Sequence, residues 1–68
     1  MNEEKFNMEL RRFLKKVGIN GQREIETATR QAIESGRIRG NETLHARMVL
    51  EIEGLGLHAV VEDDIALE

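Results

Sequence analysis

The sequence contains no cysteine, proline, tryptophan or tyrosine, and only two phenylalanines. Without cysteine, disulfide bonds and thiolate metal sites are excluded. Two histidines are too few for a structural zinc site unless carboxylates or a second chain contribute ligands. We therefore expect no metal and no cofactor, and the absence of cysteine fits a reducing compartment.

Long apolar runs are also missing. No stretch approaches the roughly 20 residues that a membrane-spanning helix needs. The first residues, Met1 to Lys5, are acidic and lack the apolar core of a signal peptide. We expect a cytoplasmic protein that does not enter a membrane. Leu67 and Glu68 are either native residues or the remnant of an expression tag, so no inference about the fold rests on them.

The chain has 68 residues, which predicts a single domain over residues 1–68. A domain of this size buries only about 60% of its unfolded surface. Small folds are usually stabilised by disulfides, a metal or a partner subunit. Since the composition disfavours the first two, we expect a homodimer.

Charge is divided unevenly along the chain, whose net charge is −3. Residues 1–40 hold nine Lys/Arg and six Asp/Glu, a balance of +3, whereas residues 41–68 hold one Arg and seven Asp/Glu, a balance of −6. Halves of opposite charge attract each other within a chain or between two chains. The overall acidity counts against a dedicated nucleic-acid binder.

The hydrophobic period changes between Gly36 and Gly40, and this change predicts the fold class. Before it, apolar residues recur every three or four positions, as in amphipathic helices. We expect one helix from Glu3 to Val17, capped by Asn2 and stopped by Gly18, and a second from Gln22 to Ser35, ended by Gly36. The expected apolar positions are Phe6, Leu10, Phe13, Leu14 and Val17 in the first helix and Ile25, Ala28, Ala32 and Ile33 in the second.

After Gly40 the apolar residues alternate, which predicts an antiparallel β-hairpin. The expected inner positions are Leu44, Ala46, Met48, Leu50 and Ile52 on one strand and Leu57, Ala59 and Val61 on the other. The expected class is α+β, with two N-terminal helices packed on the hairpin or on a three-stranded sheet. A third strand could come from Arg37–Arg39 or continue through Ile65, with Glu62–Asp64 forming a solvated turn.

The register of the hairpin follows from charge and turn chemistry. Paired residue numbers that sum to 109 leave Gly54-Leu55 as a two-residue loop with glycine first, as a type II′ turn requires. On the outer face this register pairs Glu51 with His58, Val49 with Val60, Arg47 with Glu62 and His45 with Asp64. A sum of 111 would require a positive φ at Leu55.

Three apolar residues fall outside the expected core faces. Val49 and Val60 lie side by side on the outer face of the hairpin, and Met8 lies among basic residues of the first helix. Each is either an isolated exposed side chain or part of an interface with a second subunit. We treat Met8, Val49 and Val60 as candidate interface residues.

Residues suited to catalysis are few, and we expect no enzymatic activity. Ser35 is the only serine and is explained by its place at a helix end. In the expected register the rungs of His45 and His58 lie roughly 20 Å apart along the strands, too far to share one metal ion.

The segment Gly18-Ile19-Asn20-Gly21 is a GxxG stretch between the two expected helices. It resembles the loop with which KH domains grip single-stranded nucleic acid. The residues of this alternative site are Lys15, Lys16, Gly18, Gly21 and Arg23. Against it, KH loops usually carry a basic residue where this sequence has Ile and Asn, and no strand precedes the first helix. A winged-helix arrangement fits less well because the hairpin is acidic.

Several strings resemble a known family. They are Met1–Met8, Phe13–Ile19, Gln22–Glu26, Gly40–Leu44 and Ile52–Leu57. Together they resemble a family of very short proteobacterial proteins classed as a domain of unknown function. The resemblance implies a bacterial cytoplasmic protein and carries no activity or site residue with it. Our leading hypothesis is therefore a non-enzymatic interaction or scaffold module acting as a homodimer, and weak nucleic-acid binding is the alternative.

Overall fold

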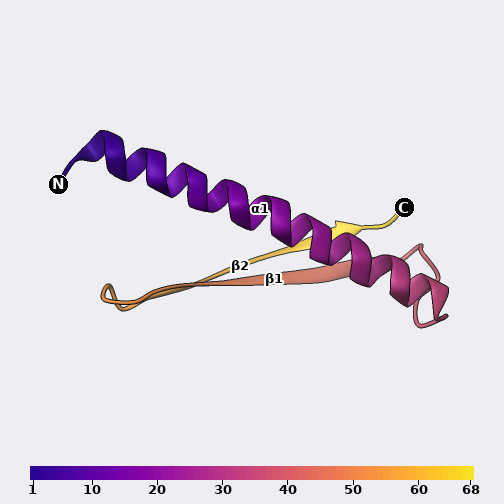
Figure 1. Cartoon of the computed structure of the whole chain (residues 1–68). Coiled ribbons are helices and arrows are strands. Elements are labelled where there is room, and N and C mark those ends of the chain that lie inside the picture. The colour runs from indigo at the N-terminus through magenta and orange to yellow at the C-terminus, as the bar shows by residue number, and fades with distance from the viewer. The chain divides into compact units, whose positions relative to one another are not determined.

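The computed structural model describes residues 1–68 and divides them into two units, residues 1–35 and residues 36–68. The first unit is one α-helix and the second is one β-hairpin (Figure 1). The expected α+β class is therefore confirmed.

Helix α1 runs without interruption from Glu3 to Glu34, 32 residues. Its N-terminus is capped as expected, because the side chain of Asn2 accepts a hydrogen bond from the backbone N–H of Lys5 at 3.1 Å. Glu3 and Glu4 occupy the first turn, where the helix dipole favours anions. Ser35 is the C-cap, and Gly36 follows with φ of +78°.

The expectation of two helices separated at Gly18 is wrong. Gly18 and Gly21 both lie within α1, and the chain makes no turn between them. Two glycines inside a helix cost about 2 kcal/mol relative to alanine. Ending one helix and starting another would leave up to four carbonyls and four N–H groups without helical partners. No proline enforces such a break, so the continuous helix is preferred.

Strands β1 (Thr43–Ile52) and β2 (Leu57–Ala66) form a two-stranded antiparallel sheet. Their partners include Leu44 with Ile65 and Ile52 with Leu57, so the register sum of 109 is confirmed. The third strand is not formed. Arg37–Arg39 precede the sheet without being part of it, and Ile65 belongs to β2. The acidic residues before Ile65 are strand residues because they continue the pairing with β1.

The hairpin loop differs from the expected two-residue turn. Four residues, 53–56, connect the strands, and the backbone N–H of Leu55 donates to the carbonyl of Ile52 at 3.4 Å. Gly54 and Gly56 have φ of +83° and +63°, and no other residue type has a positive φ. The two glycines thus take the positive φ values that the chain reversal requires, and Leu55 does not need one.

Neither unit contains a buried side chain. A lone helix and a lone two-stranded sheet each present an apolar face that they cannot cover themselves. Phe6 and Phe13 remain 50% and 49% exposed, and Val61 remains 65% exposed. No helix of the structure is both long and apolar enough to span a membrane.

Candidate interaction surfaces

The apolar stripe of α1 is the first candidate surface. Apart from the adjacent pair Phe13 and Leu14, successive members are three or four residues apart, so they share one side of the helix. The stripe consists of Phe6, Leu10, Phe13, Leu14, Val17, Gly21, Ile25, Ala28 and Ala32. All the apolar positions expected in the two separate helices, with the exception of Ile33, therefore form one surface.

The opposite side of α1 carries charged side chains, some of which form exposed ion pairs with each other. Arg12 pairs with Glu9 one turn before it, and Arg30 pairs with Glu26 at 3.4 Å. Pairs of this exposed kind stabilise a helix by only a few tenths of a kcal/mol each. They shape the charged face without defining a binding site.

Met8 lies outside the stripe and is 71% exposed. It lines a shallow hollow together with Glu4, Asn7 and Arg11, all from neighbouring turns of α1. A hollow on one helix surface has no enclosing wall. Met8 is therefore an exposed side chain outside the stripe, and its place in an interface stays a prediction.

The residues of the nucleic-acid alternative do not form a loop. Lys15, Lys16, Gly18, Gly21 and Arg23 are all interior residues of α1. A GxxG clamp requires a turn whose backbone approaches the nucleic-acid backbone. Since Gly18–Gly21 is regular helix, the resemblance to a KH loop has no structural basis.

The two faces of the hairpin are the next candidate surfaces. The apolar face pairs Met48 with Val61 and Leu50 with Ala59, as expected from the alternation. Its one charged member is Asp63, opposite Ala46. On the other face Val49 stands directly opposite Val60, and these side chains are 41% and 39% exposed. Both faces are therefore open to contact.

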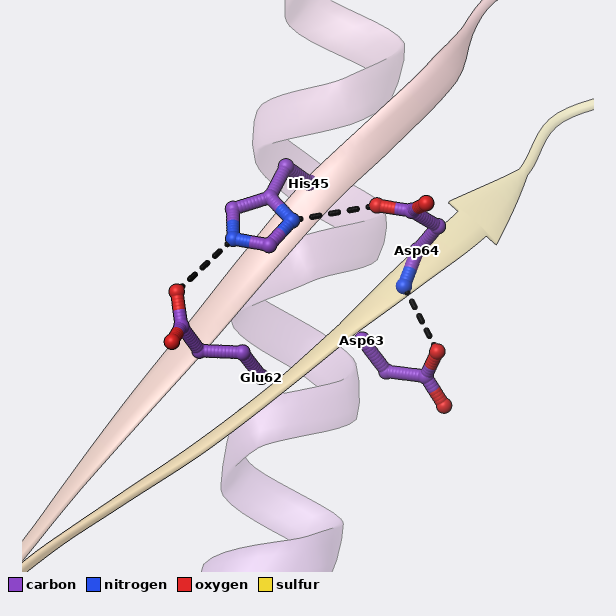
Figure 2. A network of polar contacts seen from close by, with 4 residues as sticks. All are labelled: His45, Glu62, Asp63 and Asp64. Carbon is purple, nitrogen blue, oxygen red and sulfur yellow. Dashed lines mark hydrogen bonds and ion pairs between the residues drawn. The ribbon is translucent and has the colours of Figure 1, made fainter.

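Charged pairs surround the two valines. His58 Nδ1 lies 3.5 Å from Glu51 Oε1, and His45 Nδ1 lies 3.0 Å from Asp64 Oδ1. Both pairs were expected from the register. Glu62 lies opposite Arg47 in the register, as expected, and its carboxylate contacts the diagonal neighbour His45 at Nε2, at 2.9 Å (Figure 2).

His45 therefore lies between two carboxylates of β2 (Figure 2). The contact with Glu62, and secondly that with Asp64, raises the pKa of the imidazole above its usual value. Asp63 joins the network from the other face, since its Oδ1 accepts the backbone N–H of Asp64 at 2.8 Å. The diagonal contact was not predicted from the sequence, although long side chains at diagonal positions of a sheet are within reach of each other.

Glu42 organises the segment between α1 and β1. Its carboxylate accepts the backbone N–H groups of Arg39 and Gly40 at 2.8 and 2.9 Å, and its carbonyl accepts from the N–H of Leu67 at 3.0 Å. The hydrogen bonds from Arg39 and then Gly40 lower the pKa of Glu42. Nothing in the sequence pattern predicted this contact.

The histidine and acidic side chains do not gather into a metal site. No set of three or more His, Asp or Glu side chains is arranged to hold an ion. The contacts of His45 are those of an exposed ion-pair network, since its side chain is 60% exposed.

A family model described as a family of unknown function, DUF6494, matches residues 1–68, the whole chain. This match confirms the resemblance noted from the sequence. No curated protein and no solved structure matches the chain.

Proposed function

The chain belongs to this family of unknown function, DUF6494, and we propose from its own residues that it is a small non-enzymatic interaction module acting as a homodimer. The observation that carries the proposal is that neither α1 nor the hairpin contains a buried side chain. Both units nevertheless present organised apolar faces. A surface of this kind is suited to binding another surface, not to enclosing a small substrate.

The stability of each unit also calls for a partner. An isolated two-stranded hairpin is marginally stable at best in water. Most of the stability of a protein helix comes from packing its amphipathic face. With no cysteine in the chain, disulfides cannot supply the missing stability. A second copy is the partner that is always present when the protein itself is present.

Charge supports association between copies. Residues 1–40 have a balance of +3 and residues 41–68 one of −6. The opposite charges of these two parts attract each other within a chain or between two chains. The candidate contacts on the faces not used for the main apolar packing are Met8, Val49 and Val60.

For the location we propose the bacterial cytoplasm. The grounds are the family resemblance and a composition without cysteine, which suits a reducing compartment.

Light scattering across a hundredfold dilution tests the proposal. We expect a mass near twice 7.8 kDa that persists on dilution. A mass of 7.8 kDa at every concentration, with the circular dichroism of the folded chain, would contradict it. The double variant Val49→Thr/Val60→Thr keeps β-branched side chains and reports whether this pair contributes to the interface. If the dimer of this variant dissociates at a higher protein concentration than the natural dimer, the two valines contribute to the interface.

A further inference from the structure

Positions along the apolar stripe of α1 are arranged symmetrically about residue 19, whereas their side-chain sizes are not. Eight positions form the central line of the stripe: Phe6, Leu10, Phe13, Val17, Gly21, Ile25, Ala28 and Ala32. Their spacing averages about 3.7 residues, so the line drifts by roughly 80° around a straight helix between residues 6 and 32, and two helices that pack along it wind round each other in a right-handed sense. Each position in the first half has a counterpart in the second half, and the two residue numbers of every such pair sum to 38.

The two halves of this line differ in size. The first half carries the large residues Phe6, Leu10 and Phe13, and the second half carries Gly21, Ala28 and Ala32, with Ile25 among them. We propose that α1 pairs in antiparallel orientation with α1 of a second copy, with the twofold axis passing beside residue 19. This inference rests on the proposed homodimer and names its interface, orientation and register.

Antiparallel pairing matches a larger residue with a small one at three of the four contacts and sets Phe13 against the partner's Ile25 at the fourth. Phe6 faces the partner's Ala32, Leu10 faces the partner's Ala28, and Val17 faces the partner's Gly21. Facing positions that alternate large and small residues fill the space between two helices at a normal interaxial distance of about 8–10 Å. A parallel pair would set Phe6 against Phe6 and Ala32 against Ala32, which leaves the helices too far apart at one end to pack at the other.

The helix dipoles favour the same orientation, because they oppose each other in an antiparallel pair and align in a parallel pair.

The surface to be covered is available. Phe6 and Phe13 are each about half exposed, at 50% and 49%, and Ile25 is 42% exposed. The helix is 32 residues long, about 48 Å, so the twofold axis repeats every contact at both ends. Each large residue thus contributes twice to the dimer.

Cross-linking of single cysteines tests the orientation, because the natural chain contains none. Leu10→Cys and Ala28→Cys are prepared separately, checked by light scattering, and then mixed and oxidised. In the antiparallel register these two positions face each other within disulfide range. The matched control is Lys15→Cys mixed with Arg23→Cys, whose numbers also sum to 38 but which lie away from the stripe.

We expect the mixture of Leu10→Cys and Ala28→Cys to form a disulfide-linked dimer about tenfold faster than the control mixture or either variant alone. Ala28→Cys linking to itself as fast as to Leu10→Cys would indicate parallel helices and overturn the inference. A dimer by light scattering without the Leu10–Ala28 link would overturn it too, and the proposed homodimer would stand. A monomer at every concentration would overturn both.

Spin labels away from the stripe give a second measurement that leaves all packing residues intact. Labels at Asn20→Cys lie next to the twofold axis, so we expect a short distance between the two copies. Labels at Lys5→Cys should be about 40 Å apart. Short distances at both positions would contradict the antiparallel arrangement.

Discussion

The imidazole Nε2 of His45 lies 2.9 Å from Oε1 of Glu62, two positions away from the residue directly opposite His45 in the sheet. Nδ1 of the same ring lies 3.0 Å from Oδ1 of Asp64. One side chain of β1 therefore joins two acidic side chains of β2 that would otherwise repel each other. The protonated ring serves this purpose best, since it donates to both carboxylates.

This contact predicts how the stability of the hairpin depends on pH. The pKa of His45 is higher in the folded than in the unfolded chain. Its stabilisation is therefore fully present below the unfolded pKa, near 6.5, and is lost as the pH rises through the folded pKa. We expect NMR titration to give a higher pKa for His45 than for a histidine in an unfolded peptide. His45→Gln should remove this contribution to the pH dependence of thermal unfolding, and an unchanged profile would contradict the prediction.

Glu42 predicts an effect of opposite sign. Its pKa is lowered by the N–H groups that it accepts, so its stabilisation is present above the unfolded pKa and is lost as the pH falls through the folded pKa. We expect Glu42→Gln to speed hydrogen exchange at the amides of Arg39 and Gly40. Glu53→Gln, in the loop at the other end of the hairpin, is the control and should leave both amides unchanged.

Two glycines of the chain should respond in opposite ways to alanine. Gly36 has φ of +78°, which an alanine adopts only with strain, so Gly36→Ala should destabilise the chain by about 1 kcal/mol. Gly18 lies inside α1, and a methyl group at this position would meet no atom within 4 Å, so Gly18→Ala should stabilise the helix by about 1 kcal/mol. Thermal unfolding followed by circular dichroism at equal protein concentration measures both. Destabilisation by Gly18→Ala would indicate a break in the helix at that position.

The antiparallel helix pair predicts that a size exchange is tolerated. Leu10→Ala removes two leucine side chains from each dimer, about 1.5 kcal/mol apiece, and should raise the dissociation constant about a hundredfold. Ala28→Leu places leucine against leucine and should also weaken the dimer. The double variant restores one large and one small residue at each contact.

We therefore expect the double variant to dimerise more tightly than either single variant, as measured by sedimentation equilibrium. If the losses of dimer affinity in the two single variants simply add up in the double variant, residues 10 and 28 do not face each other. Leu14→Ala combined with Ala28→Leu is the matched control, and it should show no such recovery.

Much of the hairpin could be predicted from the sequence, because its information is local. The alternation from Leu44 to Ile52 defines the faces, and a shift of one residue would turn every side chain to the wrong side. The loop was predicted less well. Gly54 was identified as the residue with positive φ, but Gly56 shares that role in the structure, which lengthens the loop while the register stays the same.

The helical half shows why a glycine is a weak indicator of a helix end. Gly18 and Gly36 look alike in sequence, and only Gly36 ends the helix. The difference lies in the residues after each glycine. Val17, Gly21 and Ile25 continue the apolar spacing across Gly18, whereas alternation begins after Gly36. Weighing that continuity above the two glycines would have predicted one helix.

The contacts of single side chains were less predictable than the elements. The pairs His45–Asp64 and Glu51–His58 follow from register alone. The contacts of His45 with Glu62 and of Glu42 with Arg39 and Gly40 depend on side-chain rotamers and on the path of a connecting segment. Neither leaves a periodic signal in the sequence.

Because the sheet has only two strands, both β1 and β2 have an outer backbone edge to which another extended chain could add. Asp63 disfavours the addition of such a chain to the edge of the sheet. It is the one charged residue on the apolar face, and a like strand added in register would bring a second aspartate beside it. A residue that interrupts the hydrophobic pattern thus disfavours edge-to-edge aggregation of the hairpin with other copies.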